Sequence, residues 1–566
     1  MLIEIHMIQN HSPANMNRDD LGAPKTCLFG GVPRARISSQ CLKRSIRSPQ
    51  NPEDVHNRGA GMFAQAMAAH IGCRTKFFPD LVKQELVKSQ IPVDDHERII
   101  LKAERIAVSK EKEEKRGERG AKSDPRRRTP QLIHLGPGHA KLFVEQLQQL
   151  RESHQQEYRY FLDPQVGFEE MVADLLSEVE ETEREKIVRA SWVIAKFRMK
   201  VLLRAAEGEE AEAELETKGR EPSAQDAKII AERLPALAIE DKTLFKKLTA
   251  RKLTDDEKRQ MAQMKRLAPE KAPPGMKDFM KALQSANRFD AVDIALFGRM
   301  TTSDAFQDVE AAMQVAHAIS TNKVANETDY FTAVDDLGKT GGGAGHVDEA
   351  MYNSACFYKY FSLDWDQLVR NLAGPEPDGK KYPEAHKIWT DKLQPNAPKL
   401  AAAALGHFIR AAALTTPSGK QNSFASHCDP CGILIEIKKT KTPTSHANAF
   451  AEPVERIGKP DDDTADEKSI EGRSVACLAD HIHAIRQAYG IDSTLLWYSP
   501  KLWRFPFQYW ERSEDGKKKE DENNKPLPAK LVTPSRFSVL DQLVEAALKQ
   551  LGFQWSEVKN AGAKEA

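Results

Sequence analysis

A long block of charged, mostly helical sequence, residues 53–290, separates the N-terminal segment of this chain from its next strand-like runs. Before the block, LIEIHMI (2–8) alternates so that Ile3, Ile5 and Met7 share one face, which predicts a half-buried strand. After the block, strand-like and helical patterns follow each other again. A core that includes the first strand must therefore combine segments far apart in the sequence, with the charged block as a large excursion.

Further elements are expected in the second half of the chain. VDIALFG (292–298) is a short apolar run that favours a central strand, and DVEAAMQVAHAI (308–319) has a helical pattern. Residues 328–363 join β-branched and aromatic stretches through a glycine-rich tip, which predicts a protruding hairpin. The later expected elements are a helix at 400–414, strands at 432–438 and 495–498, and helices near 474–489 and 538–550. This pattern indicates an α+β fold class.

Composition narrows the classes of protein to which the chain can belong. The 83 Lys and Arg residues balance 83 Asp and Glu residues, which argues against a uniformly basic nucleic-acid binder and leaves only local basic patches. No stretch approaches about 18 uninterrupted apolar residues, so we expect no membrane span. The N-terminus lacks the pattern of a secretion signal, and seven Cys residues are sparse. We therefore expect a soluble cytoplasmic protein.

One local basic patch stands out near the N-terminus. Between Leu21 and Pro52 the chain carries no acidic residue. Its six positive charges are Lys25, Arg34, Arg36, Lys43, Arg44 and Arg47. Ser38 or Ser39 can cap a short helix on which Gln40 and the last three of these cations lie about one turn apart. Such a face can meet phosphate groups, although a solvated helix face is the simpler alternative.

A second polar segment, TTPSGKQNSFAS (415–426), follows the expected apolar helix and also lacks acidic residues. Gly419 permits a close approach of backbone, and Lys420 can pair with a phosphate. The alternative is an ordinary polar loop after a helix.

Four blocks of the chain, taken in order, resemble a known family. They are residues 5–47 (IHMIQNHSPANMNRDD to SSQCLKRSIR), VDIALFGRM (292–300), residues 315–364 (VAHAISTNKVANETDYFTAVDDL to SACFYKYFSLD) and TTPSGKQNSFAS (415–426). These blocks are similar to the CasC family of the RAMP superfamily. Members of that family form the crRNA-binding backbone of the type I-E CRISPR Cascade surveillance complex.

The resemblance implies an RRM-like (ferredoxin-like) palm, an enlarged helical fingers domain and a thumb β-hairpin. On this basis residues 1–49, 291–320 and 353–566 form the palm. Residues 50–290 form helical fingers with a long insertion, and residues 321–352 form the thumb hairpin.

The resemblance also implies a function in antiviral defence. The subunit would oligomerise head to tail along the guide RNA and support formation of the crRNA–DNA heteroduplex. The implied partners are crRNA, the target DNA strand, further copies of the chain and other Cascade subunits, with no membrane and no cofactor. Since guide sequences differ, contacts to phosphate and 2′-hydroxyl groups are the ones expected.

Candidate RNA-binding residues fall into three groups. The first group is the basic segment, with Arg34, Arg36, Ser38, Ser39, Gln40, Lys43, Arg44 and Arg47. The second group is the polar loop, with Ser418, Lys420, Gln421, Asn422 and Ser423. The third group is apolar and is implied by the resemblance to press on a flipped base: Met300, Tyr330 and Phe331. Tyr330 and Phe331 adjoin, so they would point to opposite faces of a strand, and packing within the hairpin is the alternative for them.

Catalytic and metal features are weak, and we expect a protein that is not an enzyme and holds no metal. Asp335 and Asp336 leave open a metal-dependent ribonuclease of the type III backbone kind, and a scaffold with incidental RNA contact is a third interpretation. Cys428 and Cys431 form a single C-x-x-C pair, too little for a zinc finger. His481 and His483 diverge around a helix axis. The aromatic run 503–510 favours packing over base stacking.

Overall fold

The computed structural model describes residues 1–47, 61–105, 129, 132–153, 155–162, 291–301, 308–333, 346–374, 396–456, 468–501 and 534–563. Four features of the sequence analysis lie outside these residues. They are most of the expected insertion (163–290), the tip of the hairpin, the Asp335 and Asp336 pair and the aromatic run 503–510.

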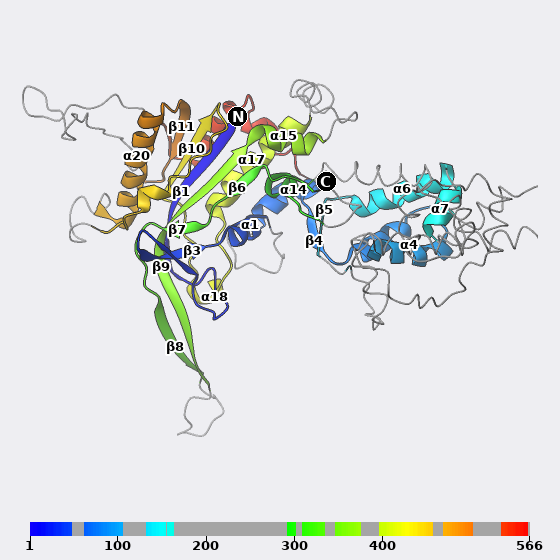
Figure 1. Ribbon diagram of the computed structural model, residues 1–566, viewed down its shortest axis with the longest axis horizontal. Coiled ribbons are helices and arrows are strands. Elements are labelled where there is room, and N and C mark those ends of the chain that lie inside the picture. Colours follow the sequence, from blue (N-terminus) through cyan, green and yellow to red (C-terminus); the bar gives the residue numbers. More distant parts are fainter. Residues whose placement is uncertain are drawn as a thin grey trace, which may run out of the picture.

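The fold is a mixed α+β structure built on one large sheet (Figure 1). Ten strands form this sheet, with the order β12-β11-β10-β1-β9-β7-β3-β2, and β6 and β8 also pair with β9. All its pairs are antiparallel except β11 with β12. The strands are β1 (Leu2–Ala14), β2 (Thr26–Phe29), β3 (Val32–Ile37), β6 (Met313–Val315), β7 (Ala318–Ser320), β8 (Glu327–Ala333), β9 (His346–Asp364), β10 (Gly432–Lys438), β11 (Ser493–Tyr498) and β12 (Ser535–Phe537).

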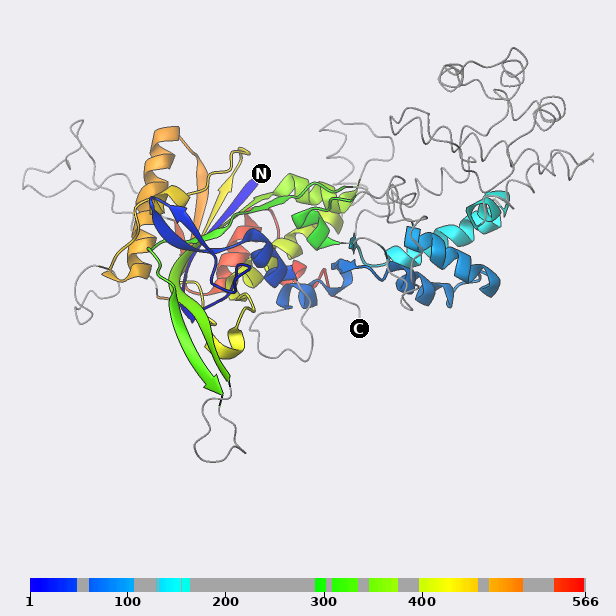
Figure 2. The ribbon, with the colours of Figure 1, turned by 60° about the horizontal axis from the view of Figure 1, so that its bottom comes forward.

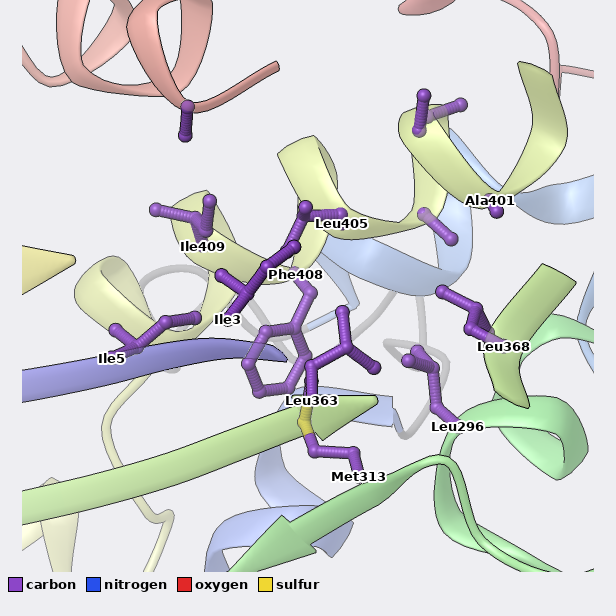
Figure 3. Close-up of a cluster of buried hydrophobic side chains, with 14 of the residues drawn as sticks. Ile3, Ile5, Leu296, Met313, Leu363, Leu368, Ala401, Leu405, Phe408 and Ile409 are labelled. Atoms are coloured by element: carbon purple, nitrogen blue, oxygen red, sulfur yellow. The ribbon is translucent and has the colours of Figure 1, made fainter. Parts of the chain in front are cut away.

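One face of the sheet is covered by the long apolar helix α17 (Asn396–Leu414). Figure 3 shows side chains of β1, β9 and β6 gathered around the ring of Phe408 on this helix. The other helices that bury side chains in this core are α1 (Ser39–Arg47), α2 (Met62–Ala66), α14 (Val292–Phe297), α15 (Trp365–Ala373), α21 (Leu540–Lys549) and α22 (Trp555–Val558). The expected helices at 400–414 and 538–550 are confirmed.

The opposite face of the sheet packs on α20 (Ile470–Tyr489) and on the short helix η4 (Ala447–Phe450). Ile8, Leu434 and Trp497 belong to this second core. The prediction that residues 2–8 form a strand is confirmed, and Ile3, Ile5 and Met7 do share a face. The prediction of half-burial is wrong, because α20 covers the face that the alternating pattern assigned to solvent.

The expected hairpin is present and is continuous with the sheet. From Asn353 to Asp364 strand β9 pairs with β1, and its outer part pairs with β8, from Tyr352 opposite Glu327 to His346 opposite Ala333. Every residue of β8 is exposed. Figure 1 and Figure 2 both show the pair projecting from the body of the protein. The strands at 432–438 and 495–498 and the helix near 474–489 are confirmed as well.

Two sequence predictions are wrong. Residues 292–297 form helix α14, not a strand; all six are buried, and the helix ends at Gly298, whose φ of 78° suits only glycine well. Residues 308–319 contain no helix. Strands β6 and β7 lie there instead, because both pair with the edge of β9 that does not face β1. Tertiary pairing overrides the local helical pattern.

A separate helical unit lies beside the sheet (Figure 1), and helical structure is confirmed for this described part of residues 53–290. It has its own apolar core, and the small sheet of β4 (Cys73–Thr75) and β5 (Ile133–Leu135) adjoins it. Its helices are α3 (Phe78–Leu86), α4 (Val93–Arg105), α6 (His139–Ser153) and α7 (Gln155–Leu162), and the one-turn helix η1 (Ala68–His70) precedes β4. None of the helices that the structure describes is long and apolar enough to cross a membrane.

Candidate nucleic-acid interface

Helix α1 begins where the sequence predicts, and it is amphipathic. The Ser38 hydroxyl accepts a hydrogen bond from the backbone N–H of Cys41 at 3.3 Å, which caps the helix. Leu42 and Ile46 are buried against the body, whereas Gln40 and Arg44, four residues apart, are exposed. The exposed face therefore carries one amide and one guanidinium on the same side of the helix.

Lys43 occupies the border between these two faces. Its Nζ lies 5.6 Å from the centroid of the Phe297 ring, in cation–π contact with α14. Burial, together with the charge of Arg74, lowers the pKa of Lys43. Its ammonium group is thus partly withdrawn from solvent.

Arg47 does not face outward, so its assignment to the exposed basic face is wrong. It is buried, and its Nε donates to Oδ2 of Asp293 at 3.0 Å. His134 Nε2 lies 2.9 Å from the same oxygen, and the Gly72 N–H donates to Oδ1 at 2.8 Å. Burial alone would raise the pKa of Asp293, but His134 and Arg47 outweigh it and lower that pKa. Arg47 therefore joins α1 to the helical unit.

Arg34 is likewise a structural residue, and its prediction as an RNA contact is corrected by its position. Its side chain is fully buried, on the face of β3 opposite the apolar Ala35 and Ile37. Its guanidinium donates to five backbone carbonyl oxygens, those of Phe29, Ser320, Thr321, Phe450 and Ala451. These bonds hold β2, β7 and η4 together and leave no donor exposed for a phosphate.

The polar loop 415–426 exposes some of its donors and buries others, namely Thr415, Thr416, Gln421 and Ser426. Ser418, Asn422 and Ser423 are exposed, and Lys420 is half-buried with a φ of 48°, a left-handed conformation that is uncommon for lysine. Gln421, the first residue of the one-turn helix α18 (Gln421–Phe424), is buried, and its amide donates to the Pro417 carbonyl at 3.0 Å. The exposed residues remain candidate contacts, whereas Gln421 shapes the loop.

Residues 12–17, which follow the buried part of β1, contact all three predicted regions. The Asn17 side chain accepts from the Ser38 N–H at the start of α1 at 2.8 Å. A Cβ on Gly419 would lie 2.5 Å from the Met16 carbonyl oxygen, so the loop approaches this segment as only glycine permits. Asn15 donates to the Met351 carbonyl at the base of the hairpin at 2.8 Å. The structure thus brings the helix, the loop and the hairpin base to one place.

The three apolar candidates are all exposed. Met300 follows α14 and is 87% exposed, and on β8 Tyr330 is 71% and Phe331 44% exposed. Tyr330 pairs with Glu349 and Phe331 with Asp348, so their side chains leave opposite faces of the hairpin. Neither aromatic side chain is buried in the hairpin, which leaves both accessible to a partner.

Sequence reasoning missed two buried polar residues beneath this surface. Lys359 of β9 lies opposite Met7 and is 1% exposed, and burial lowers its pKa to about 8. His11 is buried nearby with no hydrogen-bond partner on either ring nitrogen. Burial, helped by the charge of Lys359, lowers the pKa of His11 to about 3. The one signal was a lysine inside the apolar and aromatic run ACFYKYF.

Chemically, this surface offers cations and neutral donors around one corner of the sheet. Arg36, Lys43, Arg44 and Lys420 supply positive charge, and hydroxyl and amide groups accompany them. Phosphate oxygens and 2′-hydroxyl groups are the partners that such a mixture suits. Contacts to phosphate and 2′-hydroxyl groups do not depend on the identity of a base.

A family model described as "CT1975-like protein" matches residues 3–170 and 167–502. The chain belongs to this family. The match confirms the resemblance at the level of a CRISPR-associated (Cas) family.

The chain is also similar in structure to chains of solved protein complexes. One chain from a structure titled "CRISPR RNA-guided surveillance complex, pre-nicking" is 19% identical with a TM-score of 0.50, and the match covers 97% of this chain and 100% of that one. A second, from a structure titled "CRISPR RNA-guided surveillance complex", is 15% identical with a TM-score of 0.39 and the same two coverages. At 19% identity the first match shows a shared fold. No curated protein sequence matches the chain.

Proposed function

We propose that this protein is the crRNA-binding backbone subunit of a type I-E CRISPR Cascade complex. In this proposal the large sheet and its covering helices are the RRM-like palm, the helical unit belongs to the fingers, and the β8–β9 hairpin is the thumb. The family match and the shared fold support a Cascade-type subunit as the starting point.

The observation that carries the proposal is the convergence on residues 12–17. The capped start of α1, the donor-rich loop and the root of a projecting hairpin all contact this one segment. The convergence supports a groove-like path on which a sugar–phosphate backbone is held by α1 and the loop while the hairpin reaches over it. Guide pairing then reads the DNA sequence, as in other RNA-guided systems, and the protein supports the heteroduplex through its backbone.

Head-to-tail assembly follows from this use of the surface. A guide that is coated along its length must meet the same two patches again and again, which requires a heterologous contact between copies. The exposed β8–β9 hairpin is the element that we assign to the neighbouring copy. Tyr330 and Phe331 of this hairpin are exposed, and RNA held by the neighbouring copy would cover them.

The test is assembly on RNAs of graded length. The purified full-length chain should form particles whose mass rises in steps with RNA length, and it should co-purify with a discrete small RNA from cells that carry a CRISPR array. A closed two-fold dimer that is indifferent to RNA would contradict the proposal.

We also propose that the subunit does not cleave RNA. The alternative of a type III ribonuclease depends on Asp335 or Asp336, which lie outside the described residues. Incubation of the assembled complex with guide-complementary RNA and Mg²⁺ should leave that RNA intact. Cleavage that disappears in an Asp335→Asn, Asp336→Asn double variant would establish the ribonuclease instead.

A further inference from the structure

Three buried side chains meet on the α20 side of the sheet. They are His6 of β1, Glu436 of β10 and His446, which directly precedes η4. Each is at most 1% exposed. One ligand atom from each residue lies within 4.8 Å of those of the other two. Among the residues that the structure describes, this is the one such group of three.

The fold itself brings these residues together. In the β1–β10 ladder Glu4 lies opposite Glu436 and His6 opposite Leu434, so His6 and Glu436 are diagonal neighbours on one face. His446 is brought to the same place by the connection between β10 and η4. Its backbone N–H donates to the hydroxyl of Tyr358 at 3.0 Å, which fixes the connection on the sheet.

Polar atoms of all three residues lack hydrogen bonds although they are buried. They are Nε2 of His6, Oε2 of Glu436 and both ring nitrogens of His446. A buried polar atom without a partner costs about 1–3 kcal/mol, so several at one point need an explanation.

The remaining atoms of His6 and Glu436 are held by neighbours. His6 Nδ1 lies 2.8 Å from the Tyr358 hydroxyl, and with the proton on Nδ1 the lone pair of Nε2 is available. Oε1 of Glu436 accepts from Arg486 Nη1 at 2.9 Å and from the Ser493 hydroxyl, which leaves Oε2 available. Hydrogen bonds of this kind behind a ligand are what orients it in protein metal sites.

We propose that His6, Glu436 and His446 bind one divalent transition-metal ion of the zinc class in a buried structural site. Two imidazole nitrogens and one carboxylate oxygen form a ligand set that zinc uses, with water as the fourth ligand. Zinc bonds of about 2.0–2.2 Å place neighbouring ligands about 3.3–3.6 Å apart. His446 Nε2 and Oε2 of Glu436, 3.8 Å apart, are already close to this spacing, and all three ligand atoms lie within 4.8 Å. The ion would join β1, β10 and residues 439–446.

A buried water molecule is the competing occupant. Water donates only two hydrogens, so it can serve the three residues only if His446 turns a protonated nitrogen toward it. Lys438 forms an ion pair with Oε2 of Glu436 at 3.4 Å and is also paired with Glu4 and Thr444. An ammonium group has no lone pair with which to accept a hydrogen bond, and in the described part of the chain it is not paired with a ring nitrogen of either histidine, so Lys438 leaves the imidazole nitrogens without a partner. A dication satisfies all three lone pairs at once.

The experiment uses the full-length protein, stripped with a chelator and dialysed. Adding Zn²⁺ should raise its melting temperature with saturation at about one equivalent, since an ion bound only to the folded state stabilises it. Adding Co²⁺ instead should give the visible absorption of a four-coordinate ion, with imidazole and carboxylate ligands and no thiolate charge-transfer band. His446→Ala, on a connection rather than in the sheet, should abolish both effects.

Two variants serve as controls. His483→Ala changes another histidine, on α20, and Cys428→Ser removes the more accessible thiol of the C-x-x-C pair. Both should retain the zinc response. The proposal is wrong if wild-type protein shows no saturable response to either metal, which is the result that a buried water predicts. It is also wrong if the response survives His446→Ala or disappears in Cys428→Ser.

Discussion

Asn15 donates its side-chain amide to the backbone carbonyl of Met351 at 2.8 Å and thereby ties the end of the central strand β1 to the base of the projecting hairpin. The same amide also donates to the Gly22 carbonyl at 2.9 Å. One buried side chain thus fixes the hairpin relative to the segment that leads into β3 and α1. The parts of the proposed RNA surface are therefore positioned together.

The exposed cation of α1 provides the most direct test of RNA binding. Arg44→Glu should weaken binding to a similar extent for unrelated guide sequences and lower the salt slope of binding by about one unit for each phosphate that the protein no longer neutralises. Lys439→Glu is the matched control, because Lys439 is exposed and follows Lys438, which pairs with Leu2 at the far end of the sheet. Affinity measured by titration over a range of salt concentrations distinguishes the two. Equal effects of both variants would remove α1 from the RNA path.

The apolar side chains of the hairpin and of residue 300 should act on RNA without supporting the fold. Tyr330→Ala, Phe331→Ala and Met300→Ala should change the melting temperature of the RNA-free protein little, because all three residues are exposed. The variant that removes the base contact should lose roughly 1–3 kcal/mol of RNA binding. It should also flatten a regular pattern of reactive guide nucleotides in chemical probing of the assembled complex. If all three variants keep that pattern, none of these residues presses on a base.

Loss of the Lys359 charge should raise the stability of the fold and weaken RNA binding. Its pKa is lowered from 10.5 to about 8 by burial, so between these values the unfolded chain binds the proton and the folded chain does not. Stability should therefore rise as the pH increases from about 8 to about 10.5. Below pH 8 the buried charge lowers stability by about 3 kcal/mol.

Lys359→Met should accordingly raise the free energy of unfolding at pH 7 and remove the rise above pH 8. It should also weaken RNA binding, because a positive charge beneath the surface is removed. Denaturant titrations at several pH values measure the first effect and RNA titrations the second. A variant with unchanged pH dependence would show that Lys359 is not the titrating group.

Arg34 should matter for stability and not for RNA contact. Arg34→Met leaves five carbonyl oxygens without their donor, and three of these bonds are fully buried, so we expect a loss of about 3 kcal/mol or more in the free energy of unfolding. Arg36→Met, two residues along the same strand with a partly exposed side chain, should cost much less. If Arg34→Met unfolds like wild-type protein and selectively loses RNA affinity, the sequence-based prediction for Arg34 is right and our correction is wrong.

The local sequence pattern was sufficient to predict an element where the tertiary surroundings favour the same structure as the pattern does. The alternation of residues 2–8, the alanine-rich helix and the glycine-tipped hairpin could all be predicted from the sequence. The errors arose where a distant segment decides the outcome. All six residues of 292–297 are buried, and a buried strand and a buried short helix have similarly apolar sequences. Residues 313–315 and 318–320 are strands because they pair with β9.

The candidate site shows the same division. The Ser38 cap of α1, the close approach at Gly419 and the exposed donors of the polar loop could be predicted, because each depends on the local sequence. The inward turn of Arg34 and Arg47 was not, because their partners are carbonyl groups from three other elements and an aspartate at position 293. Nor could spacing reveal the meeting of His6, Glu436 and His446, which depends on the register of β1 with β10.

Strand β9 runs for 19 residues from the hairpin through the middle of the sheet. No loop interrupts it between the part that pairs with β8 and the part that pairs with β1. Strand β9 therefore continues into the hairpin arm unbroken, and the irregularity at its root is a register shift of β1 between His11 and Ala14, opposite Ala355 and Asn353. Swinging the arm would bend a strand that is packed between two cores. If copies of the chain assemble through this arm, a continuous strand rather than a flexible linker would separate neighbouring copies. The protein itself would then set the spacing between copies along the RNA.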